Sequence, residues 1–396
     1  MNMNQYILIV TAVYPPEPVV SAHLSEDIYE RLKKEGEEVR VLHPIPTRPN
    51  GYQFGGNGLV NEDEIVADSF TCPESKIFGR FKESYSFGMA AYSYITKHYK
   101  EIKVIYANTW PLFGQYFLAK AAKKYGIPYY IHVQDIYPES YCYKMPRLLG
   151  KFLYNILIPM DKYVQKNATG VIGISPAMIS YLSESRQVEK SKFTLVRNWQ
   201  DDQTFIDAYS SIEHEKAVCE VMYLGSINPT AHVDLLIKAF SKLESDRYHL
   251  SIIGNGSEKE DCQRMAKQLG VNVIFDVADP EQVAQIQATA NILVLCLKEG
   301  VAKTATPSKL TAYMLTGRPI VASVDLESDC AKIIREAACG EVVEPENEEA
   351  LSEAIKQINN KPPKEKDRMG NAAFEYALNN LSKERNLNIL TELIKK

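Results

Sequence analysis

The sequence predicts an α/β protein with two domains, each built around a doubly wound parallel sheet. Three observations support this fold class. Short apolar runs alternate with amphipathic segments, which favours parallel strands joined by helices. The same alternation occurs in both halves of the chain. The length of 396 residues, 45% of them hydrophobic, is sufficient for two cores of ordinary size.

The first half begins with an apolar strand over residues 6–13, a proline-rich loop over residues 14–18 and an amphipathic helix over residues 20–34. Gly36 follows this helix, as is common near a helix end. Further strands, with helices between them, are predicted at residues 39–43, 104–108, 128–133, 170–174 and 193–196. Residues 44–75 are rich in Pro, Gly, Asn and acidic residues and predict one long surface loop, either a lid or an insertion without a function.

The second half repeats the pattern after a polar, acidic segment at residues 198–208, which we predict to link the two domains. Its predicted strands lie at residues 218–224, 249–253, 271–275, 292–297, 320–324 and 341–343. Its predicted helices lie at residues 232–242, from 258 onward, at 281–288 and 347–358, and in one long helix at 364–394. Gly254, Asn255 and Gly256 follow the second strand. A lone G-x-G is a weak signal, so this is either a tight turn or a nucleotide contact.

The most informative stretch, residues 290–325, predicts strand, loop, helix and strand. The helix has recognisable ends. Thr306 is suited to cap it, Pro307 to occupy its first position, and Gly317 to end it in a left-handed conformation.

Ser308 and Lys309 therefore lie in the first turn of this helix. The positive end of a helix dipole disfavours an ammonium group there by about 0.3–1 kcal/mol. A phosphate shared between the ammonium and the free N–H groups would remove that penalty. Lys309 is thus either a phosphate ligand or a solvated lysine.

Charge and cysteine content restrict the class of protein. The formal net charge is −5, with four more basic than acidic residues in 1–200 and nine more acidic than basic residues in 201–396. The first half is therefore the one expected to meet an anionic surface, and no nucleic-acid partner is expected. Seven cysteines without a C-x-x-C pair predict reduced thiols and no zinc site. No transmembrane run or export signal is evident, so we expect a cytoplasmic protein.

Seven segments stand out in order along the chain. They are YPPE (14–17), HVQDIYPES (132–140), GISPAM (173–178), VRNWQDD (196–202), MYLGSI (222–227), IIGNGSE (252–258) and KTATPSKLTAYMLTGRPIVA (303–322). Together they resemble the family-4 glycosyltransferases, retaining enzymes of the GT-B fold. The similarity is to the bacterial fucosamine-transferase-like subgroup, which builds capsular and O-antigen polysaccharides. The order of the segments is more specific than any one of them.

This resemblance implies two Rossmann-like domains that face a cleft. Residues 1–200 would form the acceptor-side domain, and residues 201–365 the domain that binds a nucleotide-sugar donor. Residues 366–396 would form a C-terminal helix that crosses back to the first domain. No cofactor is implied, because the nucleotide sugar is a substrate. The sequence has no Asp-x-Asp triplet, which favours a site without a metal ion.

The HVQDIYPES segment ends a strand of the first domain, where the family places a His-Asp pair near the acceptor hydroxyl and the donor sugar. Here Gln134 takes the histidine position, Asp135 is kept, and His132 lies two residues earlier. The resemblance implies a catalytic Asp135, because a carboxylate beside the anomeric carbon can stabilise an oxocarbenium-like transition state or accept a proton. His132 is the second catalytic candidate, although a histidine at a strand end is also a common structural residue.

The donor diphosphate is expected to contact loops and a helix of the second domain. The candidate donor-binding residues are Gly225, Ser226, Asn255, Lys303, Thr306, Ser308 and Lys309. The two glutamates of the family would fall at Thr304 and Ala312, and its Arg and Lys clamp at Ser226 and Ala231. These four are therefore departures from the family pattern. Lys303 and Lys309 remain as cations for the diphosphate.

The sequence thus predicts a metal-independent retaining hexosyltransferase. The predicted reaction moves a hexose derivative, for example an N-acetylated or deoxy amino sugar, from a UDP-linked donor to a lipid-linked saccharide in capsular or surface polysaccharide synthesis. One alternative is a GT-B sugar-nucleotide epimerase. The other is a catalytically inert partner subunit, which the missing residues favour.

Residues 147–167 combine a broad apolar surface with the basic residues Arg147, Lys151, Lys162 and Lys166. This composition suits a helix in the interface of an anionic membrane, joined by residues 76–82. It suits a core helix of the first domain equally well. The first interpretation would place the protein peripherally on the inner face of the cytoplasmic membrane.

Overall fold

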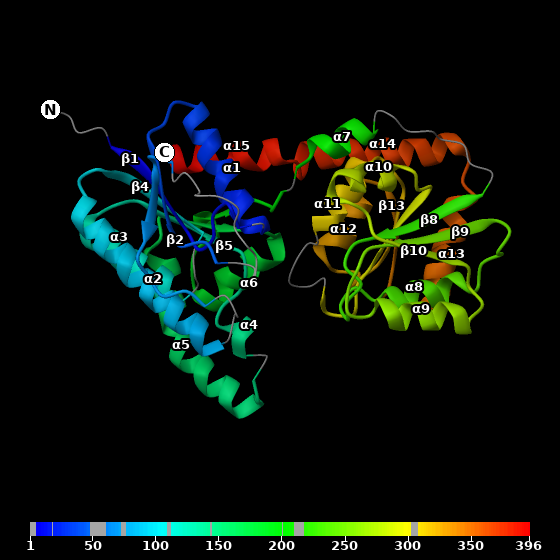
Figure 1. Ribbon diagram of the computed structural model, residues 1–396, viewed down its shortest axis with the longest axis horizontal. Helices are drawn as coiled ribbons and strands as arrows, with labels where there is room; N and C mark the ends of the chain where they lie inside the picture. Colours follow the sequence, from blue (N-terminus) through cyan, green and yellow to red (C-terminus); the bar gives the residue numbers. More distant parts are fainter. Residues whose placement is uncertain are drawn as a thin grey trace. The chain divides into compact units, whose positions relative to one another are not determined.

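The computed structural model describes residues 5–17, 19–47, 61–72, 77–108, 112–142, 145–199, 201–209, 218–301 and 308–396 (Figure 1). The chain divides into two compact units. The first contains Met1–Arg197 and Leu387–Lys396, and the second contains Asn198–Asn386. Each unit has one sheet whose described strand pairs are all parallel. The predicted α/β class with two doubly wound parallel sheets is confirmed.

The first unit has a seven-stranded sheet in the order β3-β2-β1-β4-β5-β6-β7. Its strands are β1 Tyr6–Thr11, β2 Val39–Pro44, β3 Glu64–Ala67, β4 Ile102–Asn108, β5 Tyr129–Val133, β6 Gly170–Gly173 and β7 Phe193–Leu195. All six residues of β1 are buried, as expected for a central strand covered on both faces. The strand order reverses between β1 and β4. In open α/β sheets, ligands bind outside the carboxyl ends of the strands at such a point.

The helices of the first unit join successive parallel strands. They are α1 Val20–Lys34, α2 Ile77–His98, α3 Phe113–Tyr125, α4 Glu139–Cys142, α5 Arg147–Asn167 and α6 Pro176–Arg186, with a short 3-10 turn at Lys190–Lys192. The segment predicted as one loop, residues 44–75, contains the edge strand β3, so that prediction is wrong in part. Four residues between polar neighbours carry too little periodicity to reveal an edge strand.

The second unit has a six-stranded sheet in the order β10-β9-β8-β11-β12-β13. Its strands are β8 Cys219–Leu224, β9 Tyr248–Ile253, β10 Val273–Asp276, β11 Ile292–Cys296, β12 Ile320–Ser323 and β13 Gly340–Val343. All six overlap predicted strands. The strand order reverses between β8 and β11, which again marks the expected ligand edge.

Helices cover both faces of the second sheet and enclose a core on each side. They are α7 Gln203–Tyr209, α8 Val233–Phe240, α9 Lys259–Gln268, α10 Val283–Ala288, α11 Ser308–Leu315, α12 Asp329–Glu336, α13 Glu348–Asn359 and α14 Pro363–Asn380, with a 3-10 turn at Pro280–Gln282. Alternate residues of β11 point into different cores, with Leu293 in the α11 and α12 core and Val294 in the α8 and α13 core. This alternation explains the continuous apolar run of the strand.

Two predictions near the unit boundaries are corrected. The polar linker expected at residues 198–208 contains α7, because its Phe205 and Ala208 are buried in the core of the second unit. The single helix expected at residues 364–394 is two helices, α14 and α15 (Lys383–Lys395). Leu381 and Ser382 separate them, and a carboxylate oxygen of Asp202 accepts the backbone N–H of Lys383. Residues from Leu387 onward belong to the first unit.

Candidate functional site

Each unit has a cavity whose lining includes residues at the carboxyl ends of its strands. The first-unit cavity has a volume of about 370 Å³ and is lined in part by Asn108 of β4 and His132 of β5. The second-unit cavity has a volume of about 490 Å³ and is lined in part by Leu224 of β8, Leu297 after β11 and Lys309 of α11. Both volumes fall in the range of roughly 300–1,000 Å³ common for small-molecule sites.

Two glycine-containing loops, after β8 and β9, pack directly against each other in the second unit. Gly225 donates its N–H to the carbonyl of Ile253 (2.9 Å), and Ile227 donates to the carbonyl of Asn255 (2.9 Å). Gly254 and Gly256 have φ values of +153° and +157°. A Cβ on either one would overlap a carbonyl oxygen of the β8 loop. This close approach accounts for the G-x-G turn without any nucleotide.

The candidate donor residues of these loops differ in position. Gly225 and Ser226 line the second-unit cavity, whereas Asn255 is exposed and is not among the lining residues. The Asn255 amide oxygen accepts the N–H of Gly256 (3.0 Å). Ser226 is exposed and its hydroxyl accepts from the side chain of Asn228 (3.1 Å).

Lys309 is held over the ring of Tyr223. Its Nζ donates to the Tyr223 hydroxyl (2.7 Å) and lies 4.5 Å from the ring centroid. The Tyr223 hydroxyl in turn donates to the carbonyl of Ser226 (2.6 Å). A Cβ on Gly225 would lie 2.8 Å from Nζ, so the glycine leaves the room that the ammonium occupies. Lys309 thus lines the cavity with its orientation fixed by the β8 strand and loop.

Burial makes Lys309 an unusual lysine. Burial lowers its pKa from 10.5 to about 8, although it remains predominantly charged at pH 7. Burial also raises the pKa of the neighbouring Cys296 to about 12, so that this thiol stays neutral. Among the described residues, no carboxylate lies within ion-pair distance of Lys309. A half-buried ammonium group without an anionic partner is suited to bind an anion, because the anion would restore the lost solvation.

The rest of the second-unit cavity is rigidly supported and largely apolar. The Tyr313 hydroxyl accepts the N–H of Leu224 (2.9 Å) and donates to its carbonyl (2.9 Å), which anchors the start of the β8 loop. Gln287 donates to the carbonyl of Ala312 (2.7 Å). Ala312 and Ala231 line the cavity at positions where the resemblance led us to expect a glutamate and a cation.

The remaining candidate donor residues have no described side chain. Lys303 and Thr306 lie outside the described residues, as do Thr304 and Pro307, and only the backbone of Ser308 is described. Ser308 is the first residue of α11. The predicted left-handed end of the helix at Gly317 is confirmed by its φ of +64°.

In the first unit, His132 and Asp135 both line the cavity but differ in environment. His132 is 2% exposed, and its Nδ1 lies 2.7 Å from the hydroxyl of the buried Tyr106. Burial lowers the pKa of His132 to about 3, so it is neutral at all physiological pH values. Asp135 is exposed. Burial, helped by the charge of Asp135, raises the pKa of Tyr137 to about 12.

Aromatic rings form one side of the first-unit cavity. Phe81 of α2 stacks on Tyr141 with ring centroids 5.2 Å apart, and Tyr137 contacts Tyr141 at 5.1 Å. Arg80, also of α2, contributes a guanidinium to the lining. Its Nη1 lies 3.3 Å from a carboxylate oxygen of the fully buried Glu83. The cation is therefore already offset by a carboxylate.

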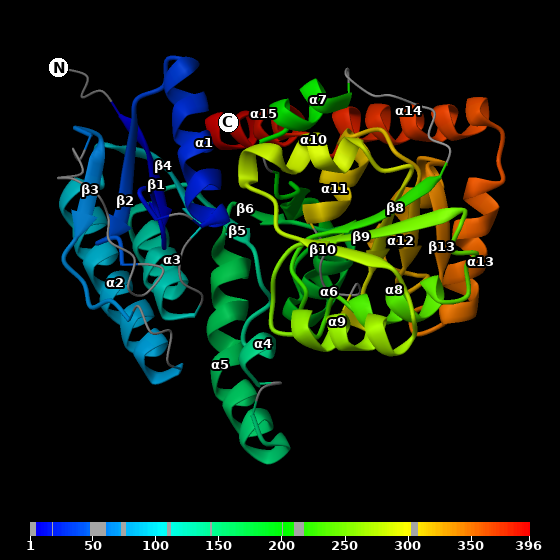
Figure 2. The same cartoon turned by 45° about the vertical axis from the view of Figure 1, so that its right-hand side comes forward.

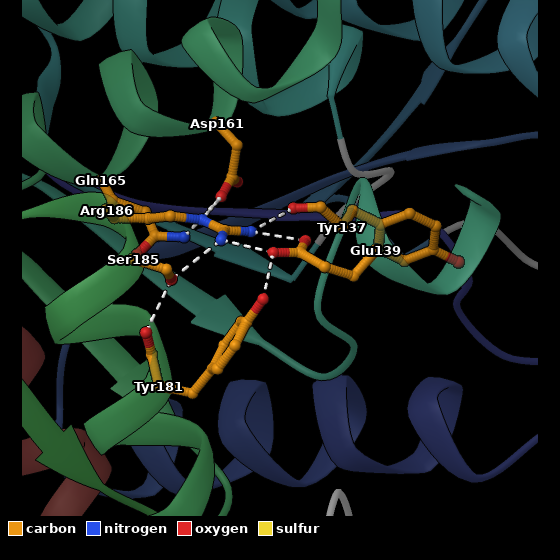
Figure 3. A network of polar contacts seen from close by, with 7 residues as sticks. All are labelled: Tyr137, Glu139, Asp161, Gln165, Tyr181, Ser185 and Arg186. Carbon is orange, nitrogen blue, oxygen red and sulfur yellow. Dashed lines mark hydrogen bonds and ion pairs between the residues drawn. The ribbon is translucent and has the colours of Figure 1, made fainter. Parts of the chain in front are cut away.

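A buried ionic network holds the HVQDIYPES segment in place (Figure 3). Arg186 of α6 is fully buried and donates to both oxygens of Glu139 (2.5 and 2.7 Å) and to the carbonyl of Tyr137 (2.7 Å). Its Nε donates to Asp161 of α5 (2.6 Å). The Tyr181 hydroxyl also donates to Glu139 (2.8 Å). Burial would raise the pKa of Glu139, but the pairing with Arg186 holds it below its ordinary value.

Two family models match the chain, one in each unit. Residues 22–199 match the glycosyl transferase 4-like domain, and residues 206–376 match the glycosyl transferases group 1 model. The chain is therefore a glycosyltransferase with a 4-like domain followed by a group 1 domain. All residues that line the second-unit cavity except Phe205 are within the group 1 match, and the first-unit cavity has most of its lining within the 4-like domain.

Similarity to known proteins extends over nearly the whole glycosyltransferase. It is 23% identical to a protein of Escherichia coli (strain K12) named "Putative colanic acid biosynthesis glycosyl transferase WcaI", over 98% of both chains. Anabaena Alr3699/HepE, solved in complex with UDP, has a TM-score of 0.71 at 13% identity, covering 99% of this chain and 100% of that chain. WaaG, a glycosyltransferase involved in lipopolysaccharide biosynthesis, has a TM-score of 0.65 at 14% identity, covering 98% and 99%. These structures confirm the GT-B fold.

Several residues around the sites were not anticipated from the glycosyltransferase sequence. Arg186 meets Asp161 and Glu139, although these acids lie 25 and 47 residues before it in the sequence. Nothing local marks such a pairing. Asn108, by contrast, ends an apolar strand, and a polar residue there was a usable signal for the ligand edge.

Within the described ranges, no group of three His, Cys, Asp or Glu side chains is placed to hold a metal ion. Likewise, none of the helices described combines the length and apolar character required to cross a membrane.

Proposed function

We propose that this glycosyltransferase transfers a hexose derivative from a UDP-linked donor to a lipid-linked saccharide in surface polysaccharide assembly, with retention of the anomeric configuration. The observation that carries the proposal is Lys309, a half-buried ammonium without an anionic partner among the described residues. It lines a cavity at the ligand edge of the group 1 domain. The diphosphate of a sugar nucleotide is the anion that such a site would bind.

The departing diphosphate gains negative charge as the glycosidic bond breaks. Lys309 stabilises that charge, together with the Gly225 loop and the proposed ligands Lys303, Thr306 and Ser308. No metal ion is required in this scheme. The solved complexes of HepE contain UDP and, in one case, UDP-glucose. This supports the proposal that the donor of the present protein is also a uridine nucleotide.

The acceptor would bind in the first unit, where Asp135 lies at the rim of the cavity. Its exposed carboxylate can accept the proton of an attacking hydroxyl or stabilise positive charge at the anomeric carbon. Asp135 follows β5, and the Arg186 network fixes the segment that carries it. The name of the E. coli relative supports a polysaccharide product.

The surface of α5 supports a lipid-linked acceptor. Figures 1 and 2 show the first turns of α5 extending beyond the sheet of the first unit. The exposed apolar side chains there are Leu148 (86%), Leu149 (53%), Phe152 (65%) and Ile156 (52%). Leu157, Asp161 and Val164 of the same helix are buried. The C-terminal part of the helix thus packs into the core. Its first turns, which carry Arg147 and Lys151, have an apolar and basic surface suited to an anionic membrane.

An inert partner subunit is the second candidate function. Ala312 and Ala231 favour it, because they line the cavity where the family pattern has a glutamate and a cation. Such a protein would bind a nucleotide sugar without turning it over.

The test begins with a thermal-shift screen of nucleotide sugars, since a bound donor raises stability according to its affinity. Turnover is then measured as UDP release with and without lipid-linked saccharides. Release that needs an acceptor supports the transferase, and release or isomerisation without one would favour the epimerase. Donor binding without turnover would favour the inert subunit. Lys309→Ala should lower turnover by about 10²-fold or more, whereas the control Lys332→Ala, on an exposed position of α12, should not.

A further inference from the structure

Strand β11 leads into a short turn that forms part of the wall of the second-unit cavity. The ladder between β11 and β12 ends where Leu297 donates its N–H to the carbonyl of Ser323 (3.0 Å). Beyond this bond, Val301 donates to the carbonyl of Lys298 (3.2 Å), which closes residues 298–301 into a turn. Leu297 and Val301 both line the cavity. The position of the turn therefore helps to set the shape of the cavity.

A buried carboxylate holds this turn in place. Asp325, two residues after the end of β12, is 7% exposed, and both of its carboxylate oxygens lie within hydrogen-bond distance of the Gly300 N–H (3.1 and 2.9 Å). A regular parallel ladder would continue with a bond to the backbone carbonyl of Asp325. That carbonyl instead accepts the N–H of Ser328 (2.9 Å). The side chain of Asp325 thus takes the next place in the ladder and fixes the turn at Gly300.

The backbone of Asp325 is itself held on both sides. Val324 donates its N–H to the carbonyl of Val343 (3.2 Å), so the ladder between β12 and β13 extends to the residue before Asp325. Ser328, which donates to the Asp325 carbonyl, caps α12 by accepting the N–H of Ala331 (3.3 Å). Asp325 is therefore a fixed point between a strand and a helix, and its carboxylate transmits that position to the turn.

Gly300 permits the turn through its backbone conformation. Its φ of +83° lies in the left-handed region, which L-residues rarely adopt. A Cβ at this position would meet no atom within 4 Å, so the glycine is required for its conformation and not for space. Such a conformation persists only where the surroundings determine it. The bond to Asp325 supplies that constraint.

The other end of the turn is tied to the β8 loop. Lys298 donates its N–H to the carbonyl of Thr230 (3.1 Å), and Thr230 also lines the cavity. The amide oxygen of Asn228 accepts both the N–H (3.0 Å) and the hydroxyl (2.7 Å) of Thr230. The turn therefore connects the end of β12 to the loop against which Lys309 is held.

We propose that Asp325 is a positioning residue of the nucleotide-sugar site, which keeps residues 298–301 in the conformation that binds the donor. This inference rests on the proposed function, because it takes the second-unit cavity as the donor site. Asp325 acts through the turn, since the described lining of the cavity includes Val301 and not Asp325. A turn that is ordered before binding avoids the entropy cost of ordering it around the ligand.

The order of the turn is tested first without a ligand, by hydrogen–deuterium exchange of peptides that cover residues 298–301. Asp325→Ala should speed exchange there by about tenfold or more, as expected for the loss of a hydrogen bond to a carboxylate. Asp325→Asn should exchange nearly as the parent does, because one amide oxygen is enough to accept the Gly300 N–H. The control Glu327→Gln, at an exposed position two residues later, should have no effect. Parental exchange in Asp325→Ala would overturn the proposal.

The effect on binding is then measured by calorimetric titration of UDP into the full chain, below the melting temperature of each variant. Asp325→Ala should raise the dissociation constant by roughly tenfold, the equivalent of ordering a few residues on binding. Asp325→Asn and Glu327→Gln should bind as the parent does. A lower melting temperature of Asp325→Ala with an unchanged dissociation constant would show a role in stability alone and would overturn the proposal. Equal losses in Asp325→Asn and Asp325→Ala would overturn it too, because they would assign the effect to the charge of the carboxylate.

Gly300→Ala tests the same turn if Asp325→Ala does not fold. The alanine keeps the N–H and meets no neighbouring atom, but it is strained at a φ of +83°. It should therefore weaken UDP binding several-fold, and parental binding would count against the proposal. Failure of the proposed function looks different, because the parent itself would then bind neither UDP nor a UDP-sugar. That result would refute the donor site, and with it the role of the turn in binding, even if Asp325→Ala loosens the turn.

Discussion

The lowered pKa of Lys309 predicts that UDP binding takes up a proton. Burial holds the pKa of the free lysine at about 8, against 10.5 in an ordinary environment. A diphosphate beside the ammonium would favour the charged form and move the pKa back upward. Without ligand, the Lys309 side chain is half deprotonated at pH 8. The protein should therefore take up about 0.5 proton for each UDP that binds at pH 8, about 0.1 at pH 7 and about 0.9 at pH 9.

The same lysine should reduce the stability of the ligand-free chain. Because its pKa is lower in the folded chain than in the unfolded chain, the folded chain binds fewer protons between pH 8 and 10.5. The loss of folding stability caused by Lys309 is therefore complete below pH 8 and becomes smaller as the pH rises toward 10.5. That cost is on the order of 3 kcal/mol at most, and less where solvent reaches the side chain. Lys309→Met should raise the free energy of unfolding at pH 7 by about 1–3 kcal/mol, and the gain should shrink above pH 8.

The assay is calorimetric titration of UDP at pH 8 in two buffers with different ionisation enthalpies. The difference in the observed heats gives the number of protons taken up. Lys309→Met should bind UDP more weakly and without proton uptake, while Lys332→Met, an exposed lysine of α12, should behave as the parent. Parent protein that binds UDP with no proton uptake, or equal uptake in Lys309→Met, would refute the placement of the diphosphate at Lys309.

Three further predictions follow from the first unit. Asp135→Asn should lower turnover by about 10²–10⁴-fold and leave UDP affinity unchanged, and a variant with parental turnover would exclude Asp135 from the reaction. Phe152→Glu should fold normally, since Phe152 is 65% exposed, yet flotation with anionic liposomes at low salt should fall about tenfold or more; a parent that does not float would contradict the interfacial role of α5. Arg186→Met should lower the free energy of unfolding in urea by about 3–5 kcal/mol at pH 7, because Glu139 and Asp161 lose their counter-ion. This deficit should shrink toward pH 5 as those carboxylates take up protons, and a pH-independent deficit would argue against the ionic explanation.

The sequence predicted strands best where both faces of the strand are buried in the core. Strands such as β1 and β11 are buried on both faces, so each appears in the sequence as an uninterrupted run of apolar residues. The edge strand β3 and the helix α7 were missed for the opposite reason. Each is short and partly exposed, so polar residues interrupt its pattern, and its role depends on partners far along the chain.

The site was predictable only where its chemistry is local. Lys309 was identified from its place in the first turn of a capped helix, and the structure adds its contact with Tyr223, 86 residues earlier. The His132 ring contacts the hydroxyl of Tyr106 on the neighbouring strand, and the position of the HVQDIYPES segment depends on Arg186. Both relations arise from strand register and helix packing. No spacing rule in the sequence reveals them.

Net charge and local charge point in different directions in this molecule. Acidic residues exceed basic ones by nine in residues 201–396, yet this half contains Lys309, the cation proposed for an anionic ligand. Exposed charges are screened within about 8–10 Å at ordinary ionic strength, so the surplus acids affect a buried cavity little. Burial over the Tyr223 ring acts locally and keeps the ammonium poorly solvated until an anion arrives. We therefore expect desolvation of this one side chain, and not the charge sum of the unit, to decide which unit receives the diphosphate.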